Sequence, residues 1–261
     1  MIRLAPLLFL VSCLFASAVQ AAGVLGPSGT ALAWPLRSEL IIEVAEDSPA
    51  LPQRVLVDQM RKAFIAWGKE TNTAPKARVS ASPDKSVENG QSIHRVNVQT
   101  QDWIADADTL AVTTYTYKKS TGEITDADIL INGTGPCLTF DETTPGDCYD
   151  ASAVLLHEVG HFLGLDHVVS TDASIMYPTL APGDGSKRKL EAVDASDIRD
   201  SYPAVETVTV TAGFAAANTA VKRMGGCASL PGSDAALWLV MLTFALRRVV
   251  RRRASLFCLQ K

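Results

Sequence analysis

Basic side chains are scarce in the central part of this 261-residue chain, and no basic patch with interleaved aromatic residues occurs in it. The formal net charge of the whole sequence is −4. Between residues 22 and 226, however, 17 basic residues stand against 27 acidic ones. An acidic domain binds polyanions poorly, so nucleic acid is not an expected partner. The sequence also lacks internal repeats, and its length suits one medium domain with additional segments.

Apolar runs long enough to span a membrane comfortably are also missing from the two ends of the chain. The runs at residues 4–16 and 235–246 are shorter than the about 20 residues that a spanning helix needs. The first run follows Arg3 and precedes several small residues, which is the pattern of a secretory signal peptide. Residues 1–21 are therefore predicted to be removed. The alternative is a lipoprotein cleavage box that ends at Cys13.

The second apolar run lies between Cys227 and an arginine-rich segment at residues 247–253. This order resembles the myxosortase-type (MYXO-CTERM) sorting tails of some Gram-negative bacteria. The resemblance implies that a sorting protease cuts near Cys227, and that residues 204–226 are a linker and residues 227–261 a tail that engages the membrane. The alternative is a short membrane anchor with its arginines on the cytoplasmic side. Both interpretations place the protein outside the cytoplasm, at the cell surface or secreted.

Cysteine is sparse, and its distribution predicts one disulfide. Of the five cysteines, Cys13, Cys227 and Cys258 lie in the terminal segments. Cys137 and Cys148 remain, and both lie in a Gly-, Pro- and Asp-rich loop at residues 133–149. In an oxidising compartment, we expect these two cysteines to pair.

Hydrophobic periodicity predicts a mixed α+β domain at residues 36–203, after a short segment at residues 22–35. Strands are expected at residues 39–44, 77–82, 93–99, 110–117 and 127–132. Helices are expected at residues 53–70, at residues 151–163 with Asp150 as the cap, and from Asp194 or Ser196 to about Tyr202. In the first helix, a stripe of apolar residues should face the sheet: Leu56, Met60, Ala63, Phe64 and Trp67.

Histidine is scarcer still, yet three of the four histidines fall within residues 157–167, HEVGHFLGLDH. His157 and His161 are one helical turn apart, so their Nε2 atoms can reach one ion at about 2.0–2.1 Å. Glu158 would lie near a water on that ion. Gly164 can end the helix in the left-handed conformation and return His167 to the same ion. Three neutral histidines that leave one position open are typical of a catalytic zinc site.

The same eleven residues fit the metzincin zinc signature HExxHxxGxxH. Downstream, SIMYP at residues 174–178 resembles the methionine turn in the form seen in matrixins, and Met176 would lie under the histidine rings. Trp34-Pro35, TLAVTTYTY, TGEITDADILIN and KRKLEAVDASDIRDSY also resemble matrixin-like bacterial metzincins, so the resemblance covers residues 34–203. It implies a twisted, mostly parallel five-stranded sheet with an antiparallel edge strand, an active-site helix and a C-terminal helix.

The resemblance further implies a secreted or surface-sorted zinc endopeptidase, expected to be a monomer, with Glu158 as the general base. Its protein or peptide substrate would pair antiparallel with the edge strand at Leu110, Ala111, Val112, Thr113 and Thr114. One alternative is a non-catalytic adhesion module, which the intact Glu158 disfavours. The other is a zinc hydrolase of a non-peptide amide, which an edge strand suited to backbone pairing disfavours.

One residue departs from the matrixin pattern: Val168 stands where matrixins usually have serine. Tyr177 directly follows Met176 and so does not occupy the later position where astacins place a tyrosine ligand, and we expect it to pack or to line a pocket. Several aspartates also suggest structural calcium, although solvated loop carboxylates or a helix cap explain them as well: Asp126, Asp128, Asp141, Asp147 and Asp150. The sequence specifies neither bond preference nor a latency mechanism.

Overall fold

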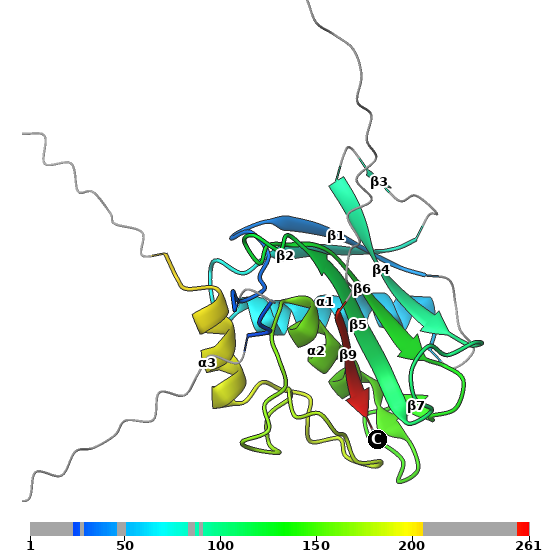
Figure 1. The fold of residues 1–261 in the computed structure, drawn as a ribbon. Helices are drawn as coiled ribbons and strands as arrows, with labels where there is room; N and C mark the ends of the chain where they lie inside the picture. Colours follow the sequence, from blue (N-terminus) through cyan, green and yellow to red (C-terminus); the bar gives the residue numbers. More distant parts are fainter. Residues whose placement is uncertain are drawn as a thin grey trace, which may run out of the picture. The chain divides into compact units, whose positions relative to one another are not determined.

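A twisted sheet forms the centre of the domain (Figure 1). The computed structural model describes residues 23–26, 29–45, 51–82, 87–88, 91–205 and 255–260. Five long strands lie in the order β2-β1-β4-β6-β5: β1 (Glu39–Val44), β2 (Lys76–Ala81), β4 (Gln91–Gln99), β5 (Thr109–Tyr117) and β6 (Ile124–Asn132). The first four in this order run parallel, and β5 is antiparallel to β6. The predicted five-stranded architecture is therefore confirmed.

Two further strands extend this sheet, and neither follows from the sequence pattern. The short β3 (Val87–Glu88) pairs with β4. At the other side, β9 (Ser255–Gln260) pairs antiparallel with β5, so β5 is not the last strand of the sheet. The tail predicted at residues 227–261 thus contributes one described strand. Its remaining residues, like the signal peptide predicted at residues 1–21, lie outside the described residues.

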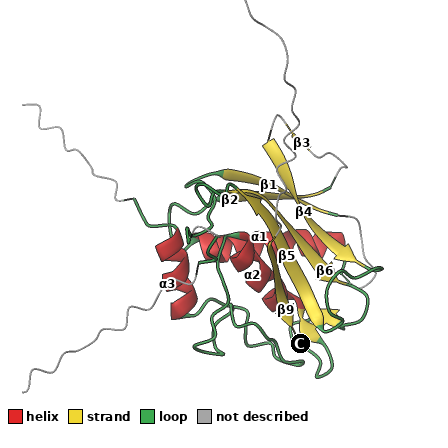
Figure 2. Ribbon diagram, viewed as in Figure 1, coloured by secondary structure: helices red, strands yellow, loops and turns green. Residues whose placement is uncertain are grey.

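Two helices cover one face of the sheet, as Figure 2 shows. They are α1 (Gln53–Gly68) and α2 (Ala151–Phe162), which pack against each other. The predicted stripe of α1 is buried, from Leu56 to Trp67, because the sheet and α2 exclude water from that face. The third helix, α3 (Ala192–Ser201), closes the domain. No helix in the described ranges has the length and apolar character needed to cross a membrane.

The start of α3 differs from the prediction. The helix begins at Ala192, with Glu191 as its N-cap, whereas a start at Asp194 or Ser196 was expected. Asp194 is the third helical residue, and its carboxylate accepts a hydrogen bond from the Glu191 backbone N–H at 2.8 Å. In this capping box both positions are acidic, and residue type alone does not show which of the two is the N-cap. Other boundaries shift by up to three residues, most at β6, which begins at Ile124.

The long loop before α2 is fixed by covalent and electrostatic contacts. The Cys137–Cys148 disulfide is present, with 4.5 Å between the two Cα atoms. Beside it, two short strands pair in parallel, β7 (Leu138–Thr139) and β8 (Tyr149–Asp150). The Arg188 guanidinium reaches the buried Asp150 carboxylate and donates to the Glu142 carbonyl at 3.0 Å. The loop is thereby attached to the beginning of α2 and to the segment before α3.

Candidate metal centre

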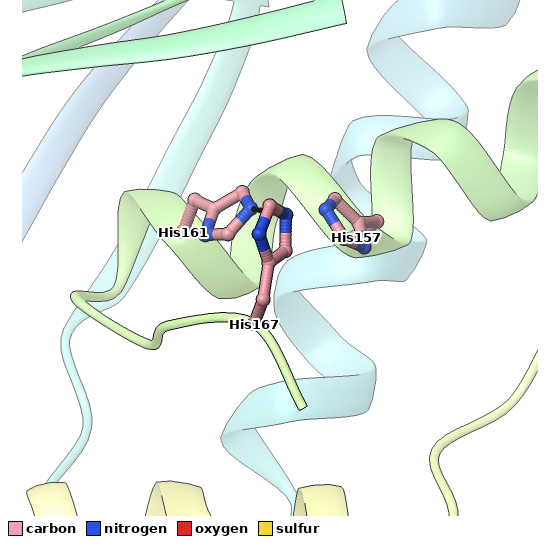
Figure 3. Close-up of side chains that lie close together, drawn as sticks. All are labelled: His157, His161 and His167. Carbon is pink, nitrogen blue, oxygen red and sulfur yellow. Dashed lines mark hydrogen bonds between the residues drawn. The ribbon is translucent and has the colours of Figure 1, made fainter. Parts of the chain in front are cut away.

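Helix α2 places two of the three clustered histidines on one buried face. Its N-terminus is capped as predicted, because the Asp150 carboxylate accepts from the backbone N–H groups of Ser152 and Ala153 at 2.9 and 3.2 Å. His157 and His161 follow one turn apart, and neither side chain is exposed. Figure 3 shows both rings on the same side of α2, with His167 reaching them from the returning chain.

The return of the chain depends on Gly164. This residue has φ +92°, the left-handed conformation that the sequence predicted for it. The backbone N–H of Gly164 donates to the His161 carbonyl at 2.7 Å, and that of Leu165 donates to the Gly160 carbonyl at 3.0 Å. This pair of bonds is the Schellman motif, which ends the helix abruptly. A Cβ at Gly164 would also lie only 2.2 Å from the Leu32 carbonyl oxygen, so the turn has no room for another residue.

Backbone carbonyls set the tautomer of the two helical histidines. His157 Nδ1 lies 2.6 Å from the Ile175 carbonyl oxygen, and His161 Nδ1 lies 2.8 Å from that of Leu165. A carbonyl only accepts, so each Nδ1 carries the hydrogen and each Nε2 of the neutral ring presents a lone pair. Burial lowers the pKa of His157 to about 3 and lowers that of His161 well below its usual value. Both rings are therefore neutral at neutral pH, which is the form that binds metal.

The three imidazoles fit a single metal ion. One ligand nitrogen from each ring lies within 4.8 Å of the other two, and the Nε2 atoms of His161 and His167 are 3.1 Å apart. In a tetrahedral zinc site, with bonds of about 2.0–2.1 Å, two ligand nitrogens are about 3.3 Å apart. The buried Nε2 of His157 has no hydrogen-bond partner among the described residues. A buried acceptor aimed at two other imidazoles is what a metal ligand requires.

Glu158 is held by the neighbouring strand of the sheet. Its carboxylate is fully buried, and the Thr113 hydroxyl of β5 lies 2.5 Å from Oε2. The same hydroxyl is 3.2 Å from the Glu158 backbone carbonyl oxygen. The segment predicted to bind substrate thus also orients the predicted general base. The sequence placed Thr113 in the edge strand but gave no signal that its side chain contacts Glu158.

The methionine turn packs against α2 between the two helical histidines. Met176 is fully buried, and its backbone N–H donates to the Ser174 hydroxyl at 2.9 Å. A Cβ added to Gly160 would lie 2.3 Å from the Met176 sulfur, so only glycine permits this approach. Asp194, in turn, accepts from the Ser174 hydroxyl at 2.5 Å and from the Ile175 backbone N–H at 3.1 Å. Because Ile175 also accepts from His157, Asp194 positions that ring indirectly.

Gly160 and Asp194 were not singled out from the sequence. A glycine inside a helical pattern is a recognisable signal of close packing. For Asp194, the sequence suggested only the start of a helix.

The C-terminal end of α2 is fixed by two aromatic side chains. The Trp34 indole N–H donates to the Phe162 carbonyl at 2.7 Å, and the Tyr202 hydroxyl donates to the Leu163 carbonyl at 2.8 Å. Tyr202 also accepts from the Trp34 backbone N–H at 3.1 Å. Carbonyls at the end of a helix lack intrahelical partners, so these donors stabilise the helix where the metal-binding turn begins. The two ends of the domain therefore meet beside the candidate site.

The segment after Met176 forms a wall beside His157. Tyr177 and Lys187 lie beside His157 and Leu180, and the gap between these side chains is too narrow to hold a water molecule. Tyr177 and Lys187 also border an open cleft of about 510 Å³. The Lys187 ammonium lies 5.0 Å from the centre of the Tyr177 ring, a distance suited to a cation–π contact. Burial lowers the pKa of Lys187, while nearby aspartates oppose that change. The side chain of Tyr177 thus lines a pocket, as predicted.

Three of the five aspartates considered for calcium have other, separate contacts. Asp126 pairs with His94, Asp128 accepts from the Arg95 backbone N–H at 2.7 Å, and Asp150 caps α2. In the part of the chain that the structure describes, the three clustered histidines are the one group of three or more side chains with metal-ligand geometry. Structural calcium therefore stays a prediction. The predicted sorting residue Cys227 lies outside the described residues.

Comparison with known families agrees with this geometry. Residues 33–203 match the family model described as Matrixin, and this range covers strands β1 to β8, all three helices and the metal-binding turn but not β9. No curated protein matches the chain significantly.

Proposed function

The chain belongs to the matrixin family of zinc metallopeptidases, and on that premise we propose that it is an endopeptidase that cleaves extracellular proteins or peptides. In this proposal His157, His161 and His167 hold one zinc ion, and Glu158 is the general base. The observation that carries it is the convergence of three imidazoles on one point, with a buried carboxylate on the residue next to His157.

Each residue of the site has a defined part in the proposed reaction. Zinc, when bound, supplies a Lewis acid that acidifies a water molecule and polarises the scissile carbonyl. The Glu158 carboxylate removes a proton from the attacking water and delivers it to the nitrogen of the leaving amine as the C–N bond breaks. The Thr113 hydroxyl keeps that carboxylate oriented through its bond to Oε2. The backbone acceptors at Ile175 and Leu165 keep the two helical rings in the metal-binding tautomer.

An extended substrate would lie along β5. The edge of Leu110–Thr114 that β9 occupies would pair with an incoming strand when it is open, and Thr113 connects this stretch to Glu158. A sheet edge recognises main-chain groups on both sides of the scissile bond, so it suits cleavage inside a chain. Such recognition favours peptides over non-peptide amides.

The location of the enzyme is also a proposal, supported by the sequence and by the disulfide. The signal-peptide pattern at residues 1–21 and the Cys137–Cys148 bridge both suit an oxidising compartment. The order of Cys227, apolar run and arginine cluster supports surface sorting in a Gram-negative bacterium, with the membrane and a sorting protease as partners. We retain the expectation of a monomer.

The decisive experiment compares Glu158→Ala with the matched surface variant Glu142→Ala, using a peptide library and mass spectrometry. Removing a general base costs about 10²–10⁴-fold in rate. Glu158→Ala should therefore lose turnover while still binding one zinc per chain, and Glu142→Ala should match the wild type. Zinc chelation should abolish cleavage, and the products should include cuts far from both peptide ends. Unchanged cleavage by Glu158→Ala would refute the assignment, and zinc binding by a wild type that cleaves no peptide would favour an adhesion module.

A further inference from the structure

Strand β9 occupies the edge of β5 that faces away from the rest of the sheet. It comprises Ser255–Gln260 and runs antiparallel to β5, with Val112 opposite Cys258 and Thr114 opposite Leu256. The pairing extends from Thr109 to Tyr115, so it covers the stretch that would bind substrate. Strand β9 also contacts α2, the helix that carries His157 and His161. In Figure 1, the red β9 arrow lies beside β5 near α2.

We propose that residues 255–260 act as an internal pseudosubstrate strand that keeps the peptidase latent. This inference rests on the proposed function. The N–H and C=O groups along one edge of a strand can pair with only one neighbour at a time. Because β9 uses the outer edge of β5 in the antiparallel direction expected for a substrate, the two exclude each other. The substrate gains access to this edge only when β9 leaves it.

The position of β9 in the chain makes it releasable. Residues 206–254 connect it to the end of the domain at Val205, so a cut anywhere in that segment separates β9 from the domain. Membrane insertion would have the same effect. If residues 235–246 cross a bilayer, the arginine cluster and everything after it lie on the side opposite the catalytic domain, where pairing with β5 is impossible. The peptidase is therefore latent only until its tail is inserted into a membrane or removed.

The expected gain in activity follows from effective concentration. A segment joined to its site by a linker is held there at an effective concentration of ~1 mM. For a strand that binds with a dissociation constant of ~0.1 mM, about one molecule in ten is open at any moment. Loss of β9 should therefore raise kcat/KM for a peptide substrate about tenfold, mainly through KM. The free strand added to the shortened enzyme should inhibit competitively.

The experiment compares three forms of the chain: full length, a form lacking residues 255–261, and a control lacking residues 213–219. The two deletions have equal length, and the control keeps β9. Intact-mass spectrometry first verifies each form, and the rate of hydrolysis of a fluorogenic peptide is then measured. In a separate assay, a synthetic peptide of residues 255–261 is added to the shortened enzyme, with a peptide of scrambled sequence as the control. Backbone amide exchange of residues 109–115 is followed in a Glu158→Ala background, which prevents self-cleavage.

Removal of residues 255–261 should raise kcat/KM about tenfold and speed amide exchange in β5, while the control behaves as the full chain. Inhibition by the synthetic peptide but not by the scrambled one would complete the support. Equal activity and equal β5 exchange in all three forms would overturn the inference and leave the proposed function intact. Absence of hydrolysis in every form would refute the proposed function, and the exchange data would still report whether β9 covers β5.

Discussion

Replacement of Gly160 by alanine tests the contact between the methionine turn and the metal-binding helix. The added Cβ would lie 2.3 Å from the Met176 sulfur and 2.9 Å from a ring carbon of Trp67. Trp67 has little freedom to move, because it is fully buried and its indole N–H donates to the Leu156 carbonyl at 2.9 Å. Relief must therefore come from Met176, which would shift away from α2 and disturb the turn that accepts from His157.

The magnitude follows from two opposing effects. Overpacking a buried site costs about 1–3 kcal/mol, and alanine gains about 1 kcal/mol over glycine inside a helix. With a clash as severe as this one, the net loss should be about 2 kcal/mol. For a domain of this size, the Tm should fall by about 4–8 °C. Zinc affinity should fall as well, because the displaced turn carries the Ile175 carbonyl that orients His157.

Gly68→Ala is the matched control, because Gly68 is the last residue of α1 and a Cβ there meets nothing within 4 Å. Both variants add one methyl group to a helical glycine, but only Gly160→Ala adds it inside the core. Urea unfolding and competitive zinc titration measure the two effects. We expect Gly68→Ala to be as stable as the wild type or up to about 1 kcal/mol more stable. A Gly160→Ala protein with wild-type stability and zinc affinity would refute the close packing of Met176 on α2.

Two further predictions concern the buried titratable side chains around the site. Asp194→Asn removes the charge that accepts hydrogen bonds from Ser174, Ile175 and Glu191. The free energy of unfolding, measured in urea, should fall by about 2–4 kcal/mol, and zinc binding should weaken. The control Asp200→Asn, on the exposed side of α3, should change neither quantity. The metal-free protein should lose stability as the pH falls below 6.5. Burial lowers the pKa of His157 to about 3 in the folded chain, so between these two pH values the unfolded chain binds a proton at this ring and the folded chain does not. The contribution of this neutral ring to stability is fully present above pH 6.5, and about 2 kcal/mol of it should be lost at pH 5. The unfolding free energy of His157→Gln should depend less on pH over this range than that of the wild type.

The parts of the site that were predictable from the sequence depend on neighbours a few residues apart. The spacing of His157 and His161 places their rings on one helix face, and Asp150 caps that helix through residues two and three positions away. Gly164 ends the helix through bonds that span at most five residues. Local sequence determines such features because no distant segment is needed to form them.

Contacts between distant segments were not predictable, and they fix the remaining geometry. The bond from Thr113 to Glu158 joins residues 45 positions apart, and Trp34 reaches the Phe162 carbonyl across 128 positions. The pocket wall after Met176 likewise takes its shape from Lys187 and Tyr177, whose contact depends on how the loop folds back. Residue type alone does not specify such pairs, because the sequence does not show which threonine or which tryptophan makes the contact.

The final strand shows why a composition-based assignment of the tail was incomplete. An apolar run followed by arginines indicates a membrane or sorting segment, and that pattern says nothing about the residues after the arginines. Ser255–Gln260 has the sequence SLFCLQ, which is free of charge, proline and glycine and therefore able to pair with an open strand edge. The long β5 presents such an edge, and natural sheets seldom leave one uncovered. Either a substrate or the chain itself must supply the neighbouring strand. Whether residues 255–260 are paired and whether the edge of β5 is accessible therefore report the same equilibrium between bound and released β9.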